Sequence, residues 1–296
     1  MRDAFASYHP VVNFSFFALV LGFTMFFTHP VCLGISLACA GAYSLYLKGR
    51  GGWRFSLLYL LPLLLLTALL NPLFNHQGAT VLTYFRSGNP LTLESILYGV
   101  AAAVMLISVI YWFSCFNAVI SSDKLLYLFG RVTPALALLL SMTLRFVPRF
   151  VAQFKIVADA QRGLGREVTA GGLLGRARRG ARLLSIVTTW ALENAVDTAD
   201  SMKSRGYGLA GRTAFARYAW ARRDVYALLF LALAGAYLVG GAATHGLDFR
   251  WFPTLKSVGR DAFSCSLYAV YFALCTLPLL LNLREDANWK LLQSRI

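Results

Sequence analysis

Six long apolar runs place the tightest constraint on what this chain of 296 residues can fold into. They lie at about 11–28, 31–47, 55–74, 94–120, 225–243 and 262–283. The apolar core of a bilayer is roughly 30 Å thick, so a helix needs about 20 apolar residues to cross it. Because backbone polar groups must be satisfied within the membrane, such runs form helices. The sequence therefore predicts an all-α polytopic membrane protein with about six transmembrane segments.

The first two runs are short, and only His29 and Pro30 separate them. Two arrangements fit this spacing. The runs form either a tight hairpin of two spanning helices or one broken, re-entrant element, and the sequence leaves both open.

Charge is scarce but strongly biased: 14% of the residues are charged, and the net charge is +15. Basic side chains concentrate after the second run and between the fourth and fifth runs, whereas the loop 75–93 carries only Arg86. Because cytoplasmic loops carry an excess of Lys and Arg, we expect an inner (plasma) membrane protein with both termini in the cytoplasm. These positions favour contact with anionic membrane lipid over nucleic-acid binding.

The chain is expected to have three parts. They are N-terminal transmembrane segments at 1–120, a cytoplasmic insert at 121–224, and C-terminal transmembrane segments with a tail at 225–296. The insert is too highly charged to cross a bilayer.

No catalytic or metal-binding pattern stands out in the sequence. Lys203-Ser204 and Lys256-Ser257 lack the glycines that precede the lysine of a nucleotide-binding P-loop. The four histidines are scattered, and the five cysteines lie in apolar stretches without C-x-x-C spacing, which favours small buried apolar residues. No charged residue occupies the centre of a predicted span, which argues against an ion-coupled carrier. We expect a non-catalytic chain with no cofactor and no metal site.

Two amphipathic helices are predicted inside the insert, because apolar residues recur there at steps of three and four. The first spans about 144–162, and its apolar face consists of Val147, Phe150, Val151, Phe154 and Val157. The second spans about 183–205, and its less polar stripe consists of Leu184, Val187, Thr188, Ala191, Ala195, Thr198 and Met202. Between them, glycines among arginines predict a flexible basic connection, with Gly171, Gly172, Gly175 and Gly180.

The two predicted helices end alike, in Arg-Gly-x-Gly with an Ala-Asp pair about one turn earlier. The residues around each arginine are Gln161-Arg162-Gly163 and Ser204-Arg205-Gly206. An arginine in the last turn meets the negative end of the helix dipole, and a glycine accommodates the left-handed residue that ends the helix. One such end is ordinary capping. Two matching ends favour docking, because each guanidinium protrudes where it can bind carboxylates or carbonyls of a partner.

These paired ends resemble the two Ala-Arg-Gly signatures of the transmembrane coupling subunit, or T component, of energy-coupling factor (ECF) transporters. That family includes permease subunits of cobalt and nickel importers. Further similarity lies in Asn71-Pro72-Leu73-Phe74, Gly78, the segment 140–148 and Arg222-Arg223-Asp224, so the resemblance covers most of the chain. Gln161 and Ser204 depart from it, because each replaces the alanine before the arginine.

The resemblance implies an ABC-type importer in which this chain transmits ATP-driven motion. Its partners would be two cytoplasmic ATPase subunits and a small membrane-embedded S component that binds a vitamin or a metal ion. Gln161, Arg162 and Gly163 would dock one ATPase, and Ser204, Arg205 and Gly206 the other. The apolar face of the first helix would contact the S component. Neither the substrate, nor whether the S component is dedicated or shared, follows from this chain.

Two other functions fit parts of the sequence. Glu193-Asn194-Ala195 is faintly similar to the Glu-Ala-Ala coupling loop of conventional ABC importer permeases, but the glycine expected a few residues later is missing. An ATP-independent membrane channel or carrier is the second alternative, and it would leave the paired arginine ends unexplained.

Overall fold

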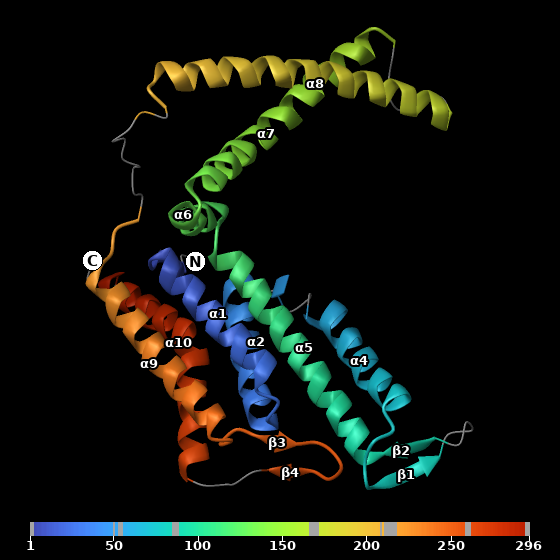
Figure 1. Ribbon diagram of the computed structural model, residues 1–296, viewed down its shortest axis with the longest axis vertical. Coiled ribbons are helices and arrows are strands. Elements are labelled where there is room, and N and C mark those ends of the chain that lie inside the picture. Colours follow the sequence, from blue (N-terminus) through green and yellow to red (C-terminus); the bar gives the residue numbers. More distant parts are fainter. Residues whose placement is uncertain are drawn as a thin grey trace. The chain divides into compact units, whose positions relative to one another are not determined.

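A computed structural model of the chain describes residues 3–49, 51–52, 56–84, 89–165, 172–207, 209, 218–257 and 262–293. Helices dominate this described part, which also holds two short two-stranded sheets (Figure 1). The chain divides into two compact units. Unit 1 comprises Met1–Leu125 and Tyr218–Ile296, and unit 2 comprises Leu126–Arg217.

Six main helices build the described part of unit 1. They are α1 (Pro10–Phe26), α2 (Pro30–Lys48), α4 (Leu61–Phe74, after the π-helical turn η2, Ser56–Leu60), α5 (Leu93–Val119), α9 (Arg222–Ala243) and α10 (Ala262–Gln293). A short 3-10 helix, η1 (Phe5–Ser7), precedes α1. α5 packs against α1, α2 and α4, while α10 packs against α2 and α9 (Figure 1). α4 therefore lies at one edge of the bundle, and α9 and α10 lie at the other.

The six predicted apolar runs coincide with these six helices, which confirms the all-α polytopic membrane fold. α2, α5, α9 and α10 are each long and apolar enough to cross a membrane, whereas α1 and the segment Leu58–Phe74 are shorter apolar helices. α1 and α2 are two separate helices. Thr24 near the end of α1 bonds Ser36 near the start of α2, with 2.8 Å between the hydroxyl oxygens, which is the pattern of a helical hairpin.

Both helices of this hairpin begin with the dipeptide His-Pro. Nδ1 of His9 and Nδ1 of His29 each accept a hydrogen bond from the backbone N–H two residues later, at 3.3 Å in both cases. Proline suits the first helical position, because its missing N–H needs no partner there. Both imidazoles are buried, so these histidines are helix caps, a function that the scattered positions of histidine in the sequence did not reveal.

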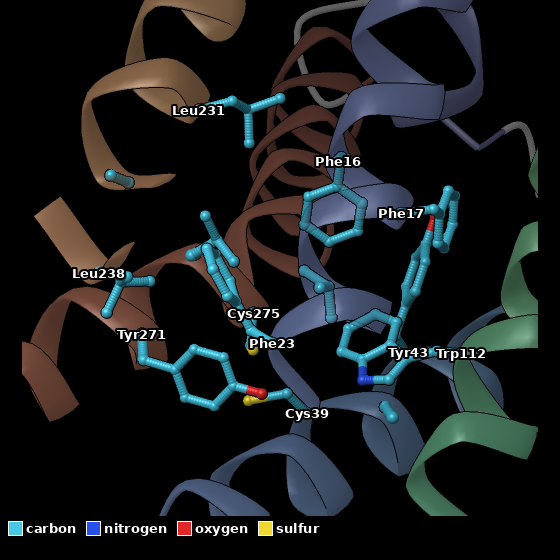
Figure 2. Packing of buried hydrophobic residues seen from close by; sticks show 14 of the residues in the cluster. Phe16, Phe17, Phe23, Cys39, Tyr43, Trp112, Leu231, Leu238, Tyr271 and Cys275 are labelled. Atoms are coloured by element: carbon cyan, nitrogen blue, oxygen red, sulfur yellow. The ribbon is translucent and has the colours of Figure 1, made fainter. Parts of the chain in front are cut away.

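The core of unit 1 forms where α1, α2, α5, α9 and α10 meet (Figure 2). Phe16 of α1 packs edge-on against Trp112 of α5, with 5.8 Å between the ring centroids. Leu231 and Leu238 of α9 and Tyr271 of α10 are also fully buried. Aromatic rings bury large areas, so they dominate the packing of these helices.

A chain of polar contacts runs through this core. Trp112 Nε1 donates to Ser36 Oγ at 2.9 Å, and Ser36 in turn bonds Thr24. The hydroxyls of Thr24 and Tyr271 lie 3.2 Å apart. Because these groups bond one another, they connect α1, α2, α5 and α10 through the apolar interior.

α4 packs closely on α5 at Gly99. A Cβ atom there would lie 2.7 Å from the Ala68 carbonyl oxygen and 3.0 Å from Asn71 Cβ, so glycine permits this approach. Gly78, just after α4, has a φ of +148°, and a Cβ atom would meet Glu94 Oε2 at 2.6 Å. Two features of the family resemblance, the segment that begins at Asn71 and Gly78, therefore meet at the junction of α4 and α5.

Two antiparallel hairpins cover one end of unit 1. One pairs β1 (Val81–Tyr84) with β2 (Pro90–Thr92), and the other pairs β3 (Phe249–Arg250) with β4 (Lys256–Ser257). The Ala79 N–H donates to the Pro253 carbonyl at 3.0 Å, so the two loops are joined.

The cysteines agree with the sequence prediction at four positions. Cys32, Cys39, Cys115 and Cys275 are buried, as expected for small apolar residues. Cys265 is exposed on α10, so the prediction of burial is wrong there. A helix of a membrane bundle has an outer apolar face, and an apolar stretch of sequence does not distinguish that face from the buried one.

Unit 2 contains α7 (Pro134–Gly163) and α8 (Leu173–Ser204), and α6 (Ser122–Val132) leads into it. α7 starts ten residues before the predicted helix, with Pro134 at its first position. This helix is also long and apolar enough to cross a membrane, although it is not among the six predicted runs. The cytoplasmic location of the insert stays a prediction.

The predicted flexible connection is wrong from Leu173 onward, because α8 already begins there. Gly175 and Gly180 each cost a helix about 1 kcal/mol relative to alanine. The residues between them are three arginines and one alanine, which are good helix formers, and the helix continues through both glycines. Gly171 lies outside the described residues.

Candidate functional site

α7 and α8 cross one another within unit 2 (Figure 1). At the crossing, Phe150 of α7 meets Trp190 of α8 edge to face, with 5.8 Å between the ring centroids. The Arg149 guanidinium lies over the same indole, 5.6 Å from its centroid. Edge-to-face rings and a cation over an indole are both favourable geometries, so these three side chains hold the crossing point.

Part of the predicted stripe of α8 is turned inward: Val187 is buried, and Ala191, Thr198 and Met202 are half-buried. Leu183 and Val187 are buried, and Trp190 and Asn194 are half-buried, at steps of four, three and four residues. The predicted stripe begins at Leu184, which is exposed. Because one residue corresponds to about 100° around a helix, Leu184 points to a different side of α8 from the buried Leu183. Sequence reasoning missed Trp190, although its distance of seven residues from Leu183 is a helical spacing that could have revealed it.

The predicted apolar face of α7 is divided between packing and open surface. Phe150 and Val157 are half-buried. Val147, Val151 and Phe154 are 55%, 52% and 45% exposed. Part of this face therefore packs in the crossing, and the rest remains available to another molecule.

An open apolar groove of about 580 Å³ lies beside the crossing. Both helices line it, through Phe150, Val151, Phe154, Lys155, Leu184, Val187, Thr188 and Ala191. Lys155 is the one charged residue of this lining. Contiguous exposed apolar surface of this kind marks interaction sites in proteins.

Arg162 is exposed in the last turn of α7. The helix continues through Gly163, and the left-handed residue is Gly165, with a φ of +70°. The Gly165 N–H donates to the Arg162 carbonyl at 2.9 Å. The left-handed glycine expected directly after the arginine is thus found two residues later.

Arg205 is exposed at the C-cap of α8, and Gly206 follows with a φ of +74°. The Gly206 N–H donates to the Lys203 carbonyl at 2.9 Å, and the Tyr207 N–H donates to the Met202 carbonyl at 3.0 Å. These two bonds are those of a Schellman motif. Gly208, the last glycine of the second sequence motif, lies outside the described residues.

The two arginine ends therefore match in sequence but differ in structure. Arg205 is itself the C-cap, whereas Arg162 lies two residues before the C-cap Leu164. Two residues correspond to about 200° around a helix axis. Each helix thus ends in an exposed arginine, and the two side chains leave their helix ends in different directions relative to the cap.

Unit 2 is strongly basic: residues 126–217 contain fourteen Lys and Arg against five Asp and Glu. An exposed pair, Lys203 with Asp200, has 4.0 Å between its charged atoms. Such exposed pairs contribute little to stability. In the part of the chain that the structure describes, no three His, Cys, Asp or Glu side chains gather as metal ligands would. The described residues of this unit therefore combine exposed cationic helix ends with an open apolar groove.

Known proteins resemble this chain over part of its length, although no protein-family model matches it. Three curated relatives are energy-coupling factor transporter transmembrane proteins, EcfT. The Lactobacillus helveticus protein is 36% identical over 118 residues, which are 39% of this chain and 43% of the relative. The Exiguobacterium sibiricum protein is 35% identical over 108 residues (36% and 41%), and the Bacillus subtilis protein is 31% identical over 104 residues (35% and 39%).

The chain spans less than half the length of the curated relatives that it matches. The matches nevertheless agree with one another and with the apolar helices of the chain. They bear out the family resemblance seen in the sequence: over about 35–40% of its length, this chain is similar to transmembrane proteins of energy-coupling factor transporters.

Proposed function

We propose that this chain is the coupling subunit of an ECF-type ABC importer. It transmits the motion of two ATPase subunits to a small membrane-embedded S component that binds a vitamin or a metal ion. The observation that carries this proposal is the crossed pair of α7 and α8, each ending in an exposed arginine. The chain itself is non-catalytic, and ATP hydrolysis resides in the partners. The similarity to EcfT proteins supports this assignment.

The arginine ends dock the ATPases, one each. Gln161, Arg162 and Gly163 form one docking site, and Ser204, Arg205 and Gly206 form the other. A guanidinium presents a planar fork of donors, and each charge-assisted hydrogen bond contributes about 1.5–3 kcal/mol. The surplus of basic residues in unit 2 adds electrostatic steering toward an acidic groove.

The crossing converts a movement at the tips into a movement of the apolar face. Phe150, Trp190 and Arg149 hold the two helices at one point, and a helix is stiff over its length. A displacement of either tip therefore tilts its helix about the crossing and changes the groove beside it. The exposed Val147, Val151 and Phe154 then pass this change to the S component.

In this proposal the insert at 121–224 and both termini lie in the cytoplasm. The excess of Lys and Arg in the insert supports this orientation, because cytoplasmic loops are enriched in these residues. Labelling of single cysteines introduced at exposed positions of α8, from either side of intact cells, tests it. Labelling from outside would contradict the cytoplasmic placement.

The docking test is co-purification of ATPase subunits with variants of this chain. Arg162→Glu or Arg205→Glu alone should weaken docking about tenfold or more, since 1.4 kcal/mol is a factor of ten. The double variant should abolish it, because two tips on one insert bind bivalently. Full ATPase binding by the double variant would show that the arginines are only helix caps.

Three controls sharpen this test. Arg162→Lys and Arg205→Lys keep the positive charge but lose the planar fork of donors, so neither variant should bind the ATPases as tightly as the wild type does. Arg178→Ala removes an arginine from the first third of α8, far from the arginine end at Arg205, and should change little. Purification from native membranes separates the classes of transporter. An ATPase pair with a small S component supports this proposal, whereas an ATPase pair with a soluble binding protein, or no ATPase, contradicts it.

The apolar face is tested by Phe154→Glu, which places a charge in the groove. It should release the S component and retain the ATPases. The matched control is Ile156→Glu, because Ile156 is 61% exposed on the same helix but does not line the groove. Release of the ATPases with retention of the S component would mean that the two binding surfaces are assigned the wrong way round.

A further inference from the structure

The chain leaves unit 1 after Leu125, and Lys124 is buried directly before that point, with 7% of its surface exposed. Its Nζ donates hydrogen bonds to the Val119 carbonyl at 2.9 Å and to the Ala6 carbonyl at 2.7 Å. With its amide oxygen turned toward the ammonium, Asn13 accepts a third bond at 2.8 Å. Lys124 thus links the point where the chain leaves unit 1, called the exit below, to Ala6 before α1 and to Asn13 within α1.

The chain returns to unit 1 just before α9, and a second buried charge lies there. Asp224 is 2% exposed. Its Oδ2 accepts a bond from the Ala221 N–H at 2.9 Å, and its Oδ1 accepts one from the His9 N–H at 3.2 Å. Beside it, Arg223 Nη2 donates to the Ser7 carbonyl at 3.1 Å. The point where the chain returns to unit 1, called the return below, is therefore bonded to Ser7 and His9, which directly follow the Ala6 that Lys124 contacts.

We name residues 4–9, which include Ala6, Ser7 and His9, the anchor segment. This segment is itself fixed to the bundle. Phe5 is fully buried, and its N–H donates to Asn282 Oδ1 of α10 at 3.1 Å. The His9 ring stacks on Trp220 with 3.9 Å between centroids. The anchor segment therefore contacts the exit, the return and the last helix of unit 1.

The two fastening groups are charges held largely by backbone groups. A buried charge is costly unless its hydrogen-bonding positions are used. Lys124 has acceptors for all three of its N–H donors, and burial lowers the pKa of its ammonium group. Pulling the exit or the return away from the anchor segment would leave a buried charge without its partners. Both junctions therefore resist separation from the same short piece of backbone.

We propose that Lys124 and Asp224 are positioning residues for coupling, and that the anchor segment holds the exit and the return as one mechanical element. Its role in transport rests on the proposed function, whereas the link between the two junctions is testable on the chain alone. A load on one junction reaches the other through Ala6 to His9. Movement of the coupling helices is then passed on instead of being lost by local unfolding where the insert begins and ends.

The test is hydrogen exchange of the full chain in lipid nanodiscs, without ATPases. Lys124→Met should speed exchange of the Asp224 and Val225 amides, which bond the cap carbonyl of α9, by about fivefold or more. Asp224→Asn should speed exchange of the Lys124 and Leu125 amides, in the first turn of α6, to a similar extent. Faster exchange confined to the substituted junction would overturn the proposal, because the junctions would then be held independently.

The matched control is Arg222→Gln, an exposed residue next to Arg223, and it should leave both pairs of amides within about twofold of the wild type. If Lys124→Met fails to fold, Arg223→Gln tests the same link by weakening the return and measuring exchange at the exit. It removes an exposed donor to the anchor segment. A rise of about twofold or more at the α6 amides supports the anchor, and no rise contradicts it.

A second measurement separates this proposal from the docking proposal. Both anchor variants should still co-purify with ATPases, because Arg162 and Arg205 are unchanged. In the wild-type complex, ATP should alter exchange at both junctions together, and in Lys124→Met it should alter only one. Equal changes in the two proteins would refute the positioning role. The double glutamate variant tests docking alone, and its failure would leave the cross-junction result standing.

Discussion

Trp190→Ala should loosen the crossing of α7 and α8. It removes the edge-to-face contact with Phe150, worth about 0.5–1.5 kcal/mol, and the contact with the Arg149 guanidinium, worth about 0.5–1 kcal/mol at an exposed site. Alanine is a better helix former than tryptophan by roughly 0.5 kcal/mol, which offsets part of this loss. The net cost for local opening of α8 is therefore about 0.5–2 kcal/mol.

Hydrogen exchange of the α8 amides around Val187 measures this cost in the full chain. A loss of about 0.5–2 kcal/mol corresponds to exchange about 2- to 30-fold faster. Leu192→Ala is the matched control, because Leu192 lies two residues further on α8 and is 66% exposed. Trp190→Phe should retain most of the protection. If Trp190→Ala and Leu192→Ala change exchange equally, the crossing does not depend on the indole and the reasoning is refuted.

Gly206→Ala should fray the end of α8, because a φ of +74° costs residues other than glycine about 1–2 kcal/mol. Gly163→Ala should instead stabilise the end of α7 by up to about 1 kcal/mol, because Gly163 lies within the helix and has open space around it. Exchange in the last turn of each helix checks the two opposite signs, and equal effects would contradict the cap assignment. Gly99→Ala should lower the thermal unfolding midpoint, because overpacking against α4 costs about 1–3 kcal/mol. Gly34→Ala is the control, because Gly34 has open space around it and its substitution should leave the midpoint unchanged. Equal midpoints for the two variants would exclude the close approach of α4 to Gly99. Ser36→Ala should cost about 1–3 kcal/mol, because the buried indole N–H loses its acceptor, and an unchanged midpoint would rule out that bond.

The transmembrane helices could be predicted from sequence, because a membrane leaves an apolar run few alternatives to a helix. The run at 94–120, for example, corresponds to α5 at Leu93–Val119. The start of α7 was missed, since the apolar residues after Pro134 merge into an amphipathic pattern with basic residues. The helical start of α8 was missed because its glycines were weighted as breakers, although the residues between them favour a helix.

The arginine ends could also be located from sequence, because capping is local chemistry. Which glycine takes the left-handed conformation could not, since Gly163 and Gly165 fit the same motif equally well. The charges of the anchor were beyond sequence reasoning for a different reason. Lys124 bonds a carbonyl 118 residues away, and Asp224 bonds an N–H 215 residues away, so no local period records either contact.

The bond between Phe5 and Asn282 joins residues 277 positions apart, and this separation imposes an order on biosynthesis. The ribosome makes the anchor segment early, yet its partners in α9 and α10 emerge only after the whole insert has been translated. Until then, Phe5 lacks the amide that holds it and the His9 N–H lacks its carboxylate. The membrane bundle therefore closes as a late step, and a chain arrested before α9 would lack both of these contacts of the anchor segment.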